Sequence, residues 1–130
     1  MKSATLVEMV RGCDAITLHC DLNPSSENLI SAEILGVCSP RLVLVNTARG
    51  RLVDTGAALD AVHAGRLAGL CLDVYPQEPV DLKAFAQHPR VFVSPHSAGY
   101  HVGLGRMVRE GLERTVSAWL NGESLPYSVE

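Results

Sequence analysis

The stretch Arg41-Leu42-Val43-Leu44-Val45-Asn46-Thr47-Ala48-Arg49-Gly50 decides the fold. Its apolar core, residues 42–45, contains no polar side chain, so both faces of the strand that it predicts should be buried. Strands of this kind lie in the interior of parallel sheets, between layers of helices. The polar residues that follow at once, Asn46 and Arg49, should then lie where this strand ends.

Apolar runs and helical patterns alternate along the rest of the chain, which predicts an α/β fold with a parallel sheet. Ser31 and Asp54 are placed to cap two helices, and Gly65 is placed to end the second one. The predicted strands are residues 14–20, 41–46, 67–74 and 91–93, and the predicted helices before the last strand are residues 4–11, 32–37 and 55–64.

A longer helix is predicted after the last strand, because apolar residues recur there at a spacing of 3.6 and Gly122 follows. We expect its apolar stripe to pack in the core and its other side to face solvent, with Glu110 and Arg114 paired across one turn. The stripe consists of Leu104, Met107, Val108, Leu112, Val116, Trp119 and Leu120.

Composition and charge exclude several classes of protein. The 130 residues are 47% hydrophobic and 19% charged, as in a folded soluble domain, and the net charge of -3 argues against nucleic acid as a partner. No apolar run is long enough to span a membrane, and no signal peptide is recognised at the start, so we expect a cytoplasmic protein. The four cysteines (Cys13, Cys20, Cys38 and Cys71) lack metal-site spacing, and no metal is expected.

Three polar residues stand where predicted strands end and loops begin: Arg49, Glu78 and His96. In parallel sheets ligands bind beyond the carboxyl ends of the strands, so these residues are candidates for a common site. Taken alone, each of these residues also has a common interpretation that involves no ligand. An arginine after a strand and a glutamate in a loop are usually solvated, and a Pro-His pair is usually structural.

The order of several short motifs gives these residues a context. The chain resembles the D-2-hydroxyacid dehydrogenase family, which includes phosphoglycerate dehydrogenases, glyoxylate reductases and formate dehydrogenases. The resemblance implies that residues 1–130 are the C-terminal part of a nicotinamide-dinucleotide-binding domain, with a partial Rossmann fold. The motifs are Asp14-Ala15-Ile16-Thr17-Leu18-His19, Asn46-Thr47-Ala48-Arg49-Gly50, Val53-Asp54, Gly65-Arg66-Leu67-Ala68-Gly69, Leu72-Asp73-Val74, Glu78-Pro79 and Pro95-His96.

The resemblance implies hydride transfer between NAD and a small 2-hydroxy or 2-keto acid, with NADP not excluded as the cofactor. Arg49 would hold the substrate carboxylate, which a planar guanidinium binds through two hydrogen bonds. His96 would exchange a proton with the substrate oxygen, because an imidazole ordinarily titrates at about 6.5. Glu78 would orient His96 and favour its protonated form.

The resemblance also implies the cofactor contacts. Thr47, Ala48, Arg49 and His96 would lie by the nicotinamide, Asp73 would bind its carboxamide, and Cys20 with Asp21 would lie near the adenosine ribose. For Asp73 the alternative is a cap at the end of a strand. In many relatives the position of Asp21 is a proline, and the acidic residue changes the local contacts.

No G-x-G-x-x-G motif occurs in the sequence, so the expected domain lacks the glycine-rich first half that holds the pyrophosphate. We therefore expect a fragment that binds NAD poorly by itself, with a sheet edge exposed where further strands would pair. Such an edge favours a homodimer or other association. Two alternatives stay open: an NAD-binding interaction module similar to the corepressors of the same family, and a catalytically inactive truncated product.

Overall fold

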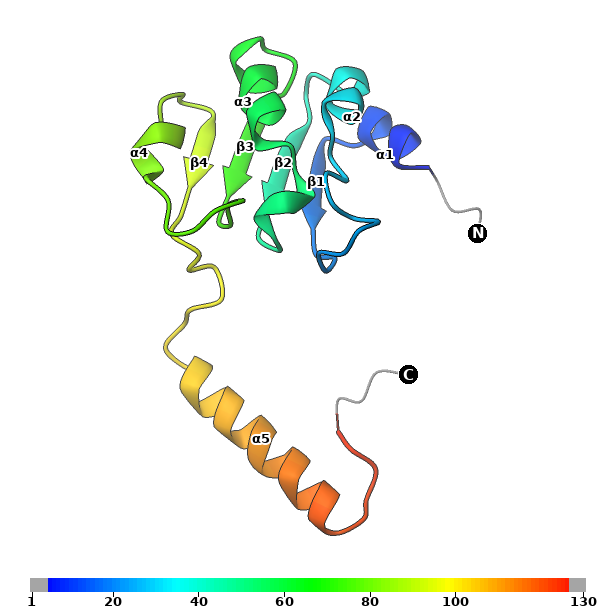
Figure 1. Ribbon diagram of the computed structural model, residues 1–130, viewed down its shortest axis with the longest axis vertical. Coiled ribbons are helices and arrows are strands. Elements are labelled where there is room, and N and C mark those ends of the chain that lie inside the picture. Colours follow the sequence, from blue (N-terminus) through cyan, green and yellow to red (C-terminus); the bar gives the residue numbers. More distant parts are fainter. Residues whose placement is uncertain (1–4, 127–130) are drawn as a thin grey trace. The chain divides into compact units, whose positions relative to one another are not determined.

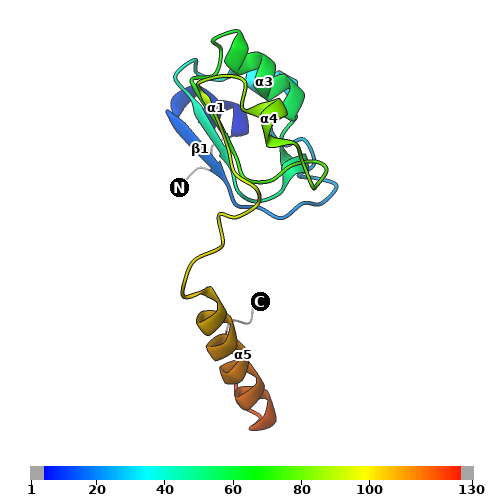
Figure 2. The same ribbon diagram turned by 90° about the vertical axis from the view of Figure 1, so that its left-hand side faces the viewer.

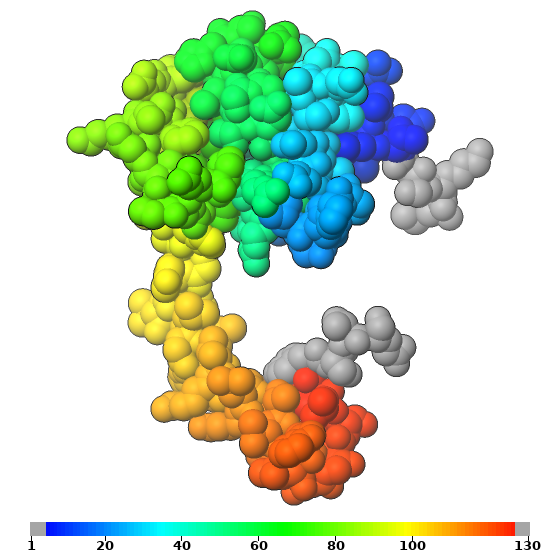
Figure 3. Space-filling view, in the orientation of Figure 1, coloured from blue at the N-terminus to red at the C-terminus, as the bar shows by residue number. Residues whose placement is uncertain are grey.

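The computed structural model describes residues 5–126. The chain divides into two compact units, Met1–Ala98 and Gly99–Glu130, which are described separately. The first unit contains a sheet and the helices that cover it, and it forms one packed body in the space-filling view (Figure 3). The described residues of the second unit, 99–126, contain one long helix.

The sheet of the first unit consists of β1 (Ala15–Leu18), β2 (Val43–Asn46), β3 (Gly69–Leu72) and β4 (Val91–Val93). Its order is β1-β2-β3-β4 and every pairing is parallel (Figure 1). The predicted α/β architecture and all four predicted strands are thus confirmed. Except for β4, each strand is shorter than predicted, because the residues beyond its ends turn into loops.

The helices α1 (Leu6–Gly12), α2 (Ala32–Val37) and α3 (Thr55–His63) connect these strands. The predicted caps are present: Ser31 accepts a hydrogen bond from Ile34 N, and Asp54 accepts one from Ala57 N at 3.0 Å. Gly65 follows α3 with a φ of 70°, which a glycine adopts without strain. The start predicted for the first helix, Ala4, lies outside the described residues.

Two short elements were not predicted: the 3₁₀ helix η1 (Gly50–Leu52) and the one-turn helix α4 (Leu82–Phe85). Both follow a strand end that carries a candidate site residue. Because each spans four residues or fewer, neither has a periodic apolar pattern that the sequence could reveal.

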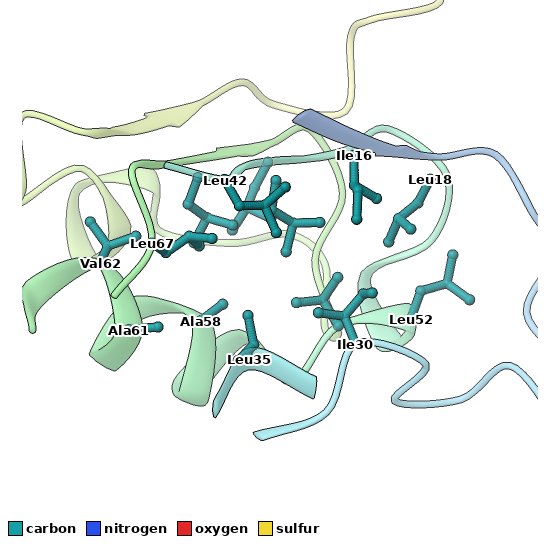
Figure 4. Packing of buried hydrophobic residues seen from close by; sticks show 14 of the residues in the cluster. Ile16, Leu18, Ile30, Leu35, Leu42, Leu52, Ala58, Ala61, Val62 and Leu67 are labelled. Carbon is teal, nitrogen blue, oxygen red and sulfur yellow. The ribbon is translucent and has the colours of Figure 1, made fainter. Parts of the chain in front are cut away.

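The core of the first unit lies between one face of the sheet and the helices. Leu44 at the centre of β2 pairs with Ile16 and Leu70 on its two neighbours, and all three are buried. Side chains from the strands meet those of α2 and α3 in this layer (Figure 4). Ala58 and Ala61 allow α3 to approach the sheet closely, since their side chains are small and completely buried.

The helices of the first unit cover only one face of the sheet, with α3 and α4 on the same side (Figure 2). On the other face Val43 and Val45 are partly exposed, and Phe92 on β4 is 64% exposed. Within the described part of this unit, the second layer that the apolar run of β2 requires is therefore not found.

The second unit contains α5 (Leu104–Leu120), and the predicted helix is confirmed. The expectation that its apolar stripe packs in a core is wrong within this unit: Met107, Leu112 and Trp119 are 58%, 61% and 70% exposed. The described residues of this unit contain no second helix or strand against which the stripe could pack. The predicted pair of Glu110 and Arg114 is also absent, since Arg114 donates to the backbone oxygen of Glu110 at 3.3 Å and the Glu110 side chain faces Arg106.

Among the described residues, no helix is both long enough and apolar enough to cross a membrane. In the same residues, no group of three or more His, Cys, Asp or Glu side chains is arranged to hold a metal ion.

Candidate active site

Glu78 and His96 come from the loops that follow β3 and β4, and the fold brings them into contact. Nδ1 of His96 lies 2.8 Å from Oε2 of Glu78, and both side chains are partly exposed. The other carboxylate oxygen, Oε1, accepts a hydrogen bond of 3.0 Å from the backbone N–H of Tyr75. Glu78 is therefore held at both oxygens, and it holds the imidazole by one nitrogen.

The charge state of this pair follows from the hydrogen bonds. The bond from His96, followed by the bond from the Tyr75 N–H, lowers the pKa of Glu78 below its ordinary value. An ionised carboxylate only accepts hydrogen bonds, so Nδ1 of His96 is assigned as the donor. Nε2 is then the ring nitrogen that can exchange a proton with a ligand.

Arg49 lies in the turn after β2, and buried Asn46 shapes this turn. The Asn46 side chain donates to the backbone oxygen of Arg49 at 2.8 Å and accepts from Ala48 N at 3.1 Å. The Arg49 guanidinium donates to the Ala48 oxygen at 2.6 Å. Gly50 comes next, and a Cβ there would clash with the backbone of Tyr75. The turn bearing Arg49 thus packs directly against the loop bearing Glu78.

One cavity of about 260 Å³ adjoins all three residues that were predicted to be catalytic. The fold therefore brings together residues that lie far apart in the sequence, each from a different strand end. Its lining consists of Leu22, Arg49, Gly50, Arg51, Tyr75, Pro76, Glu78 and His96.

Asp73 anchors the loop that carries His96. Its carboxylate is buried and accepts hydrogen bonds from the Ser94 hydroxyl and from the backbone N–H groups of Ser97 and Ala98, the latter two at 2.8 and 2.9 Å. Burial acts to raise the pKa of Asp73, but these hydrogen bonds and the nearby His96 outweigh it and the pKa is lowered. The same loop holds His96 at a φ of 54°, a strained value for a residue with a side chain.

The residues predicted to contact the cofactor are only partly brought together. Thr47 and Asp73 share a hollow of about 250 Å³ on the uncovered face of the sheet, at its carboxyl edge. Ala48, in the turn after β2, is half-buried and does not line this hollow. Cys20 and Asp21, which follow β1, are exposed and line neither this hollow nor the cavity of Arg49.

Tyr75 is the main site residue that the sequence analysis missed. Its ring is buried, and its hydroxyl contacts the backbone oxygens of Leu72 and Ser94 at 3.2 and 2.9 Å. It thereby joins the ends of β3 and β4, while its N–H holds Glu78. The only signal in the sequence is the position of a tyrosine directly after an apolar strand, where a buried hydroxyl must find a partner.

An open parallel sheet with its polar groups at the carboxyl edge is the architecture of nucleotide-binding α/β domains. The family model described as D-isomer specific 2-hydroxyacid dehydrogenase, NAD binding domain, matches residues 1–98. The chain belongs to this family, as the resemblance implied.

Similar proteins of known name or structure agree with this assignment. D-3-phosphoglycerate dehydrogenase of Sus scrofa is 38% identical over 102 residues, which are 78% of this chain and 18% of the relative. The structure of D-lactate dehydrogenase with NAD+ from Lactobacillus jensenii matches with a TM-score of 0.83 and 31% identity, over 98% of this chain and 42% of that one.

A D-isomer specific 2-hydroxyacid dehydrogenase from Xanthobacter autotrophicus, in complex with NADPH and MES, matches with a TM-score of 0.81 and 25% identity, over 96% of this chain and 51% of that one. The chain thus spans only about a fifth of the first relative and about half of the solved chains or less.

Proposed function

We propose that the chain carries the proton-exchanging and carboxylate-binding residues of an NAD(P)-dependent D-2-hydroxyacid dehydrogenase. The observation that supports this most strongly is the 2.8 Å bond between His96 and Glu78 at a cavity that Arg49 also lines. A general acid or base, its orienting carboxylate and a cation for an acidic substrate are the parts that this reaction needs.

Arg49 binds the carboxylate of the 2-hydroxy or 2-keto acid. Its guanidinium offers a planar fork of donors that matches the two oxygens, so it fixes both the position and the orientation of the substrate. The Asn46 side chain holds the turn that presents this group. The carbon next to the carboxylate then lies near His96.

His96 exchanges the proton at the substrate oxygen. During reduction of a keto acid Nε2 gives its proton to the developing alkoxide, and during oxidation Nε2 takes the proton from the hydroxyl. Glu78, ionised because its pKa is lowered, stabilises the imidazolium that the reduction consumes and the oxidation forms. It also keeps Nδ1 occupied, so that Nε2 faces the substrate.

The residues at the carboxyl edge fit the nicotinamide end of a dinucleotide, which supplies or accepts the hydride when it is bound. Oδ2 of Asp73 accepts one hydrogen bond within the fold, and a carboxylate oxygen can accept a second one, here from a carboxamide. Thr47 and Ala48 would lie against the ring and Cys20 with Asp21 near the ribose. NAD and NADP are both compatible with these residues.

The substrate class that we propose is a small 2-hydroxy or 2-keto acid. For the compartment we propose the cytoplasm, because the four cysteines are free thiols in the structure and a reducing environment preserves them.

The experiment that tests this function measures NADH formation by the complete polypeptide that carries this sequence, with D- and L-2-hydroxy acids as substrates. We expect oxidation of a D-isomer and none of its L-isomer. Arg49→Lys should raise the KM for the acid and lower kcat, because lysine keeps the charge but loses the fork. A folded polypeptide that oxidises no D-2-hydroxy acid would favour an interaction module or an inactive product instead.

A further inference from the structure

Tyr75 is bonded to both sides of the Glu78–His96 pair. Its backbone N–H donates to Oε1 of Glu78 at 3.0 Å. Its side-chain hydroxyl contacts the backbone oxygen of Ser94 at 2.9 Å, and Ser94 lies two residues before His96. Among the described residues outside the pair, Tyr75 is the only one with hydrogen bonds both to Glu78 and to the loop that bears His96.

The Tyr75 hydroxyl acts as a donor to Ser94. Burial, followed by the charge of Asp73, raises the pKa of this hydroxyl, so the proton stays on the oxygen. A hydroxyl has one proton to donate, and its contact with the Ser94 oxygen is shorter than the 3.2 Å contact with the Leu72 oxygen. The Leu72 oxygen already accepts a bond of 2.9 Å from the Ser94 N–H. Within residues 5–126, the hydroxyl is therefore the one donor that the Ser94 oxygen has.

The backbone of His96 depends on contacts of this kind. Its φ of 54° lies in the left-handed region, which a residue with a side chain keeps only when the surrounding structure holds it there. After His96, the N–H groups of Ser97 and Ala98 are bound by Asp73. Before His96, the Ser94 hydroxyl donates to Asp73 and the Ser94 oxygen accepts from Tyr75. Loss of the Tyr75 hydroxyl would remove one of the restraints that precede His96.

We propose that the Tyr75 hydroxyl is a positioning group for the proton exchange, because it fixes the His96 loop relative to the carboxylate that the Tyr75 N–H holds. This inference rests on the proposed function, which assigns the proton exchange to His96. The strength of a hydrogen bond falls steeply with distance and angle. A small displacement of the loop therefore weakens the 2.8 Å bond between Nδ1 of His96 and Glu78.

Tyr75→Phe separates this role from the packing of the ring. Phenylalanine keeps the backbone N–H that holds Glu78, and its ring can keep the contact with Phe85 on α4, where the ring centroids are 5.3 Å apart. Only the hydroxyl is removed. Tyr100→Phe is the matched control, since Tyr100 lies in the second unit and is 77% exposed.

The first measurement is the titration of Glu78 in the 130-residue chain, followed by the NMR chemical shift of its carboxyl carbon. The bond from His96 is the largest cause of the lowered pKa of Glu78. Tyr75→Phe should therefore raise this pKa toward its ordinary value, and Tyr100→Phe should leave it unchanged. An unchanged titration of Glu78 in a folded Tyr75→Phe variant would overturn the proposal.

The second measurement is the turnover of the complete polypeptide. Tyr75→Phe should lower kcat by roughly tenfold to a hundredfold, because the imidazole is misplaced in the transition state. The KM for the acid should stay within about twofold, since Asn46 and not the Tyr75 hydroxyl holds the turn of Arg49. A general loss of folded protein would instead lower the amount of active enzyme without changing the pKa of Glu78.

The possible failures are distinguishable. If His96→Ala keeps its full turnover, the proposed function is wrong and this inference is wrong with it. If His96→Ala loses turnover and Tyr75→Phe keeps it, the function stands and only the role of Tyr75 is wrong.

Hydroxyl exchange in the unmodified chain decides the question if Tyr75→Phe does not fold. The ζ-carbon signals of the tyrosines in mixed H₂O and D₂O report how fast each hydroxyl proton exchanges. The proton of Tyr75 should exchange at least about tenfold more slowly than that of Tyr100, because it is buried and bonded. Equal exchange rates for the two hydroxyls would overturn the proposal.

Discussion

The contact between His96 and Glu78 shows how single residues build this site. Arg49, Glu78 and His96 were predicted from their positions after three strands and from the order of the surrounding motifs. What the sequence could not reveal is how they are held, because Asn46 and Tyr75 act through buried hydrogen bonds between loops. Asp73 was predicted as a cofactor contact or a strand cap, and the structure shows that it anchors the loop of His96.

The ionisation of Glu78 tests the pair directly. Because the bond from His96 is the largest cause of the lowered pKa, His96→Ala should raise the pKa of Glu78 toward its ordinary value. The NMR chemical shift of the Glu78 carboxyl carbon, recorded as a function of pH, measures this change. His101→Ala should leave the titration unchanged, and an unchanged titration in His96→Ala would mean that the two side chains do not bond in solution.

The lowered pKa of Glu78 also predicts how the free energy of unfolding changes with pH. The fold favours the ionised form of Glu78, so its contribution is present above the ordinary pKa and is lost as the pH falls through the lowered one. Glu78→Gln should therefore flatten the dependence of unfolding free energy on pH in this acidic range.

Replacement of Asp73 should loosen the loop that bears His96. In Asp73→Asn an amide N–H₂ replaces an oxygen that accepts backbone hydrogen bonds, at a cost of about 1–3 kcal/mol. Hydrogen exchange at the amides of Ser97 and Ala98 should become about fivefold to a hundredfold faster, which is that cost expressed as a ratio of rates. Asp60→Asn, on α3, serves as the control, and protection that persists in Asp73→Asn would show that the loop is held by other contacts.

At the scale of elements, sequence periodicity predicted every strand of the sheet and the helices α1, α2, α3 and α5. It missed η1 and α4 because short turns are determined by contacts between loops. It also placed the stripe of α5 in a core, whereas within its own unit the stripe is exposed. Periodicity identifies an apolar face, but it does not specify what covers that face.

The close packing of η1 against the loop of Tyr75 leads to a prediction at this scale. Gly50→Ala should lower the free energy of unfolding by about 3 kcal/mol or more. The new Cβ would overlap with backbone atoms of Tyr75, which cannot move away as a flexible side chain could. Chemical denaturation of the chain measures the effect. Gly36→Ala is the matched control, since nothing surrounds that position and alanine in a helix stabilises by about 0.5–1 kcal/mol. Equal effects of both variants would contradict the packing.

At the scale of the whole molecule, the edge of β1 is unpaired within the described sheet. Unpaired strand edges favour association, so we expect the isolated chain to dimerise or aggregate at micromolar concentration. Thr17→Lys, on β1, should shift sedimentation toward the monomer, whereas Asp60→Lys on the exposed side of α3, away from the sheet edges, should not. A well-behaved monomer of the unmodified chain would contradict this expectation.

The turnover of His96→Ala in the complete polypeptide tests most directly whether His96 exchanges the proton in a D-2-hydroxyacid dehydrogenase. Because a proton donor acts chiefly in the transition state, kcat should fall by roughly a hundredfold to ten-thousandfold while the affinity for NAD stays nearly the same. Reduction of glyoxylate at an unchanged rate by His96→Ala would contradict the proton-transfer role and leave the fold as the only shared feature.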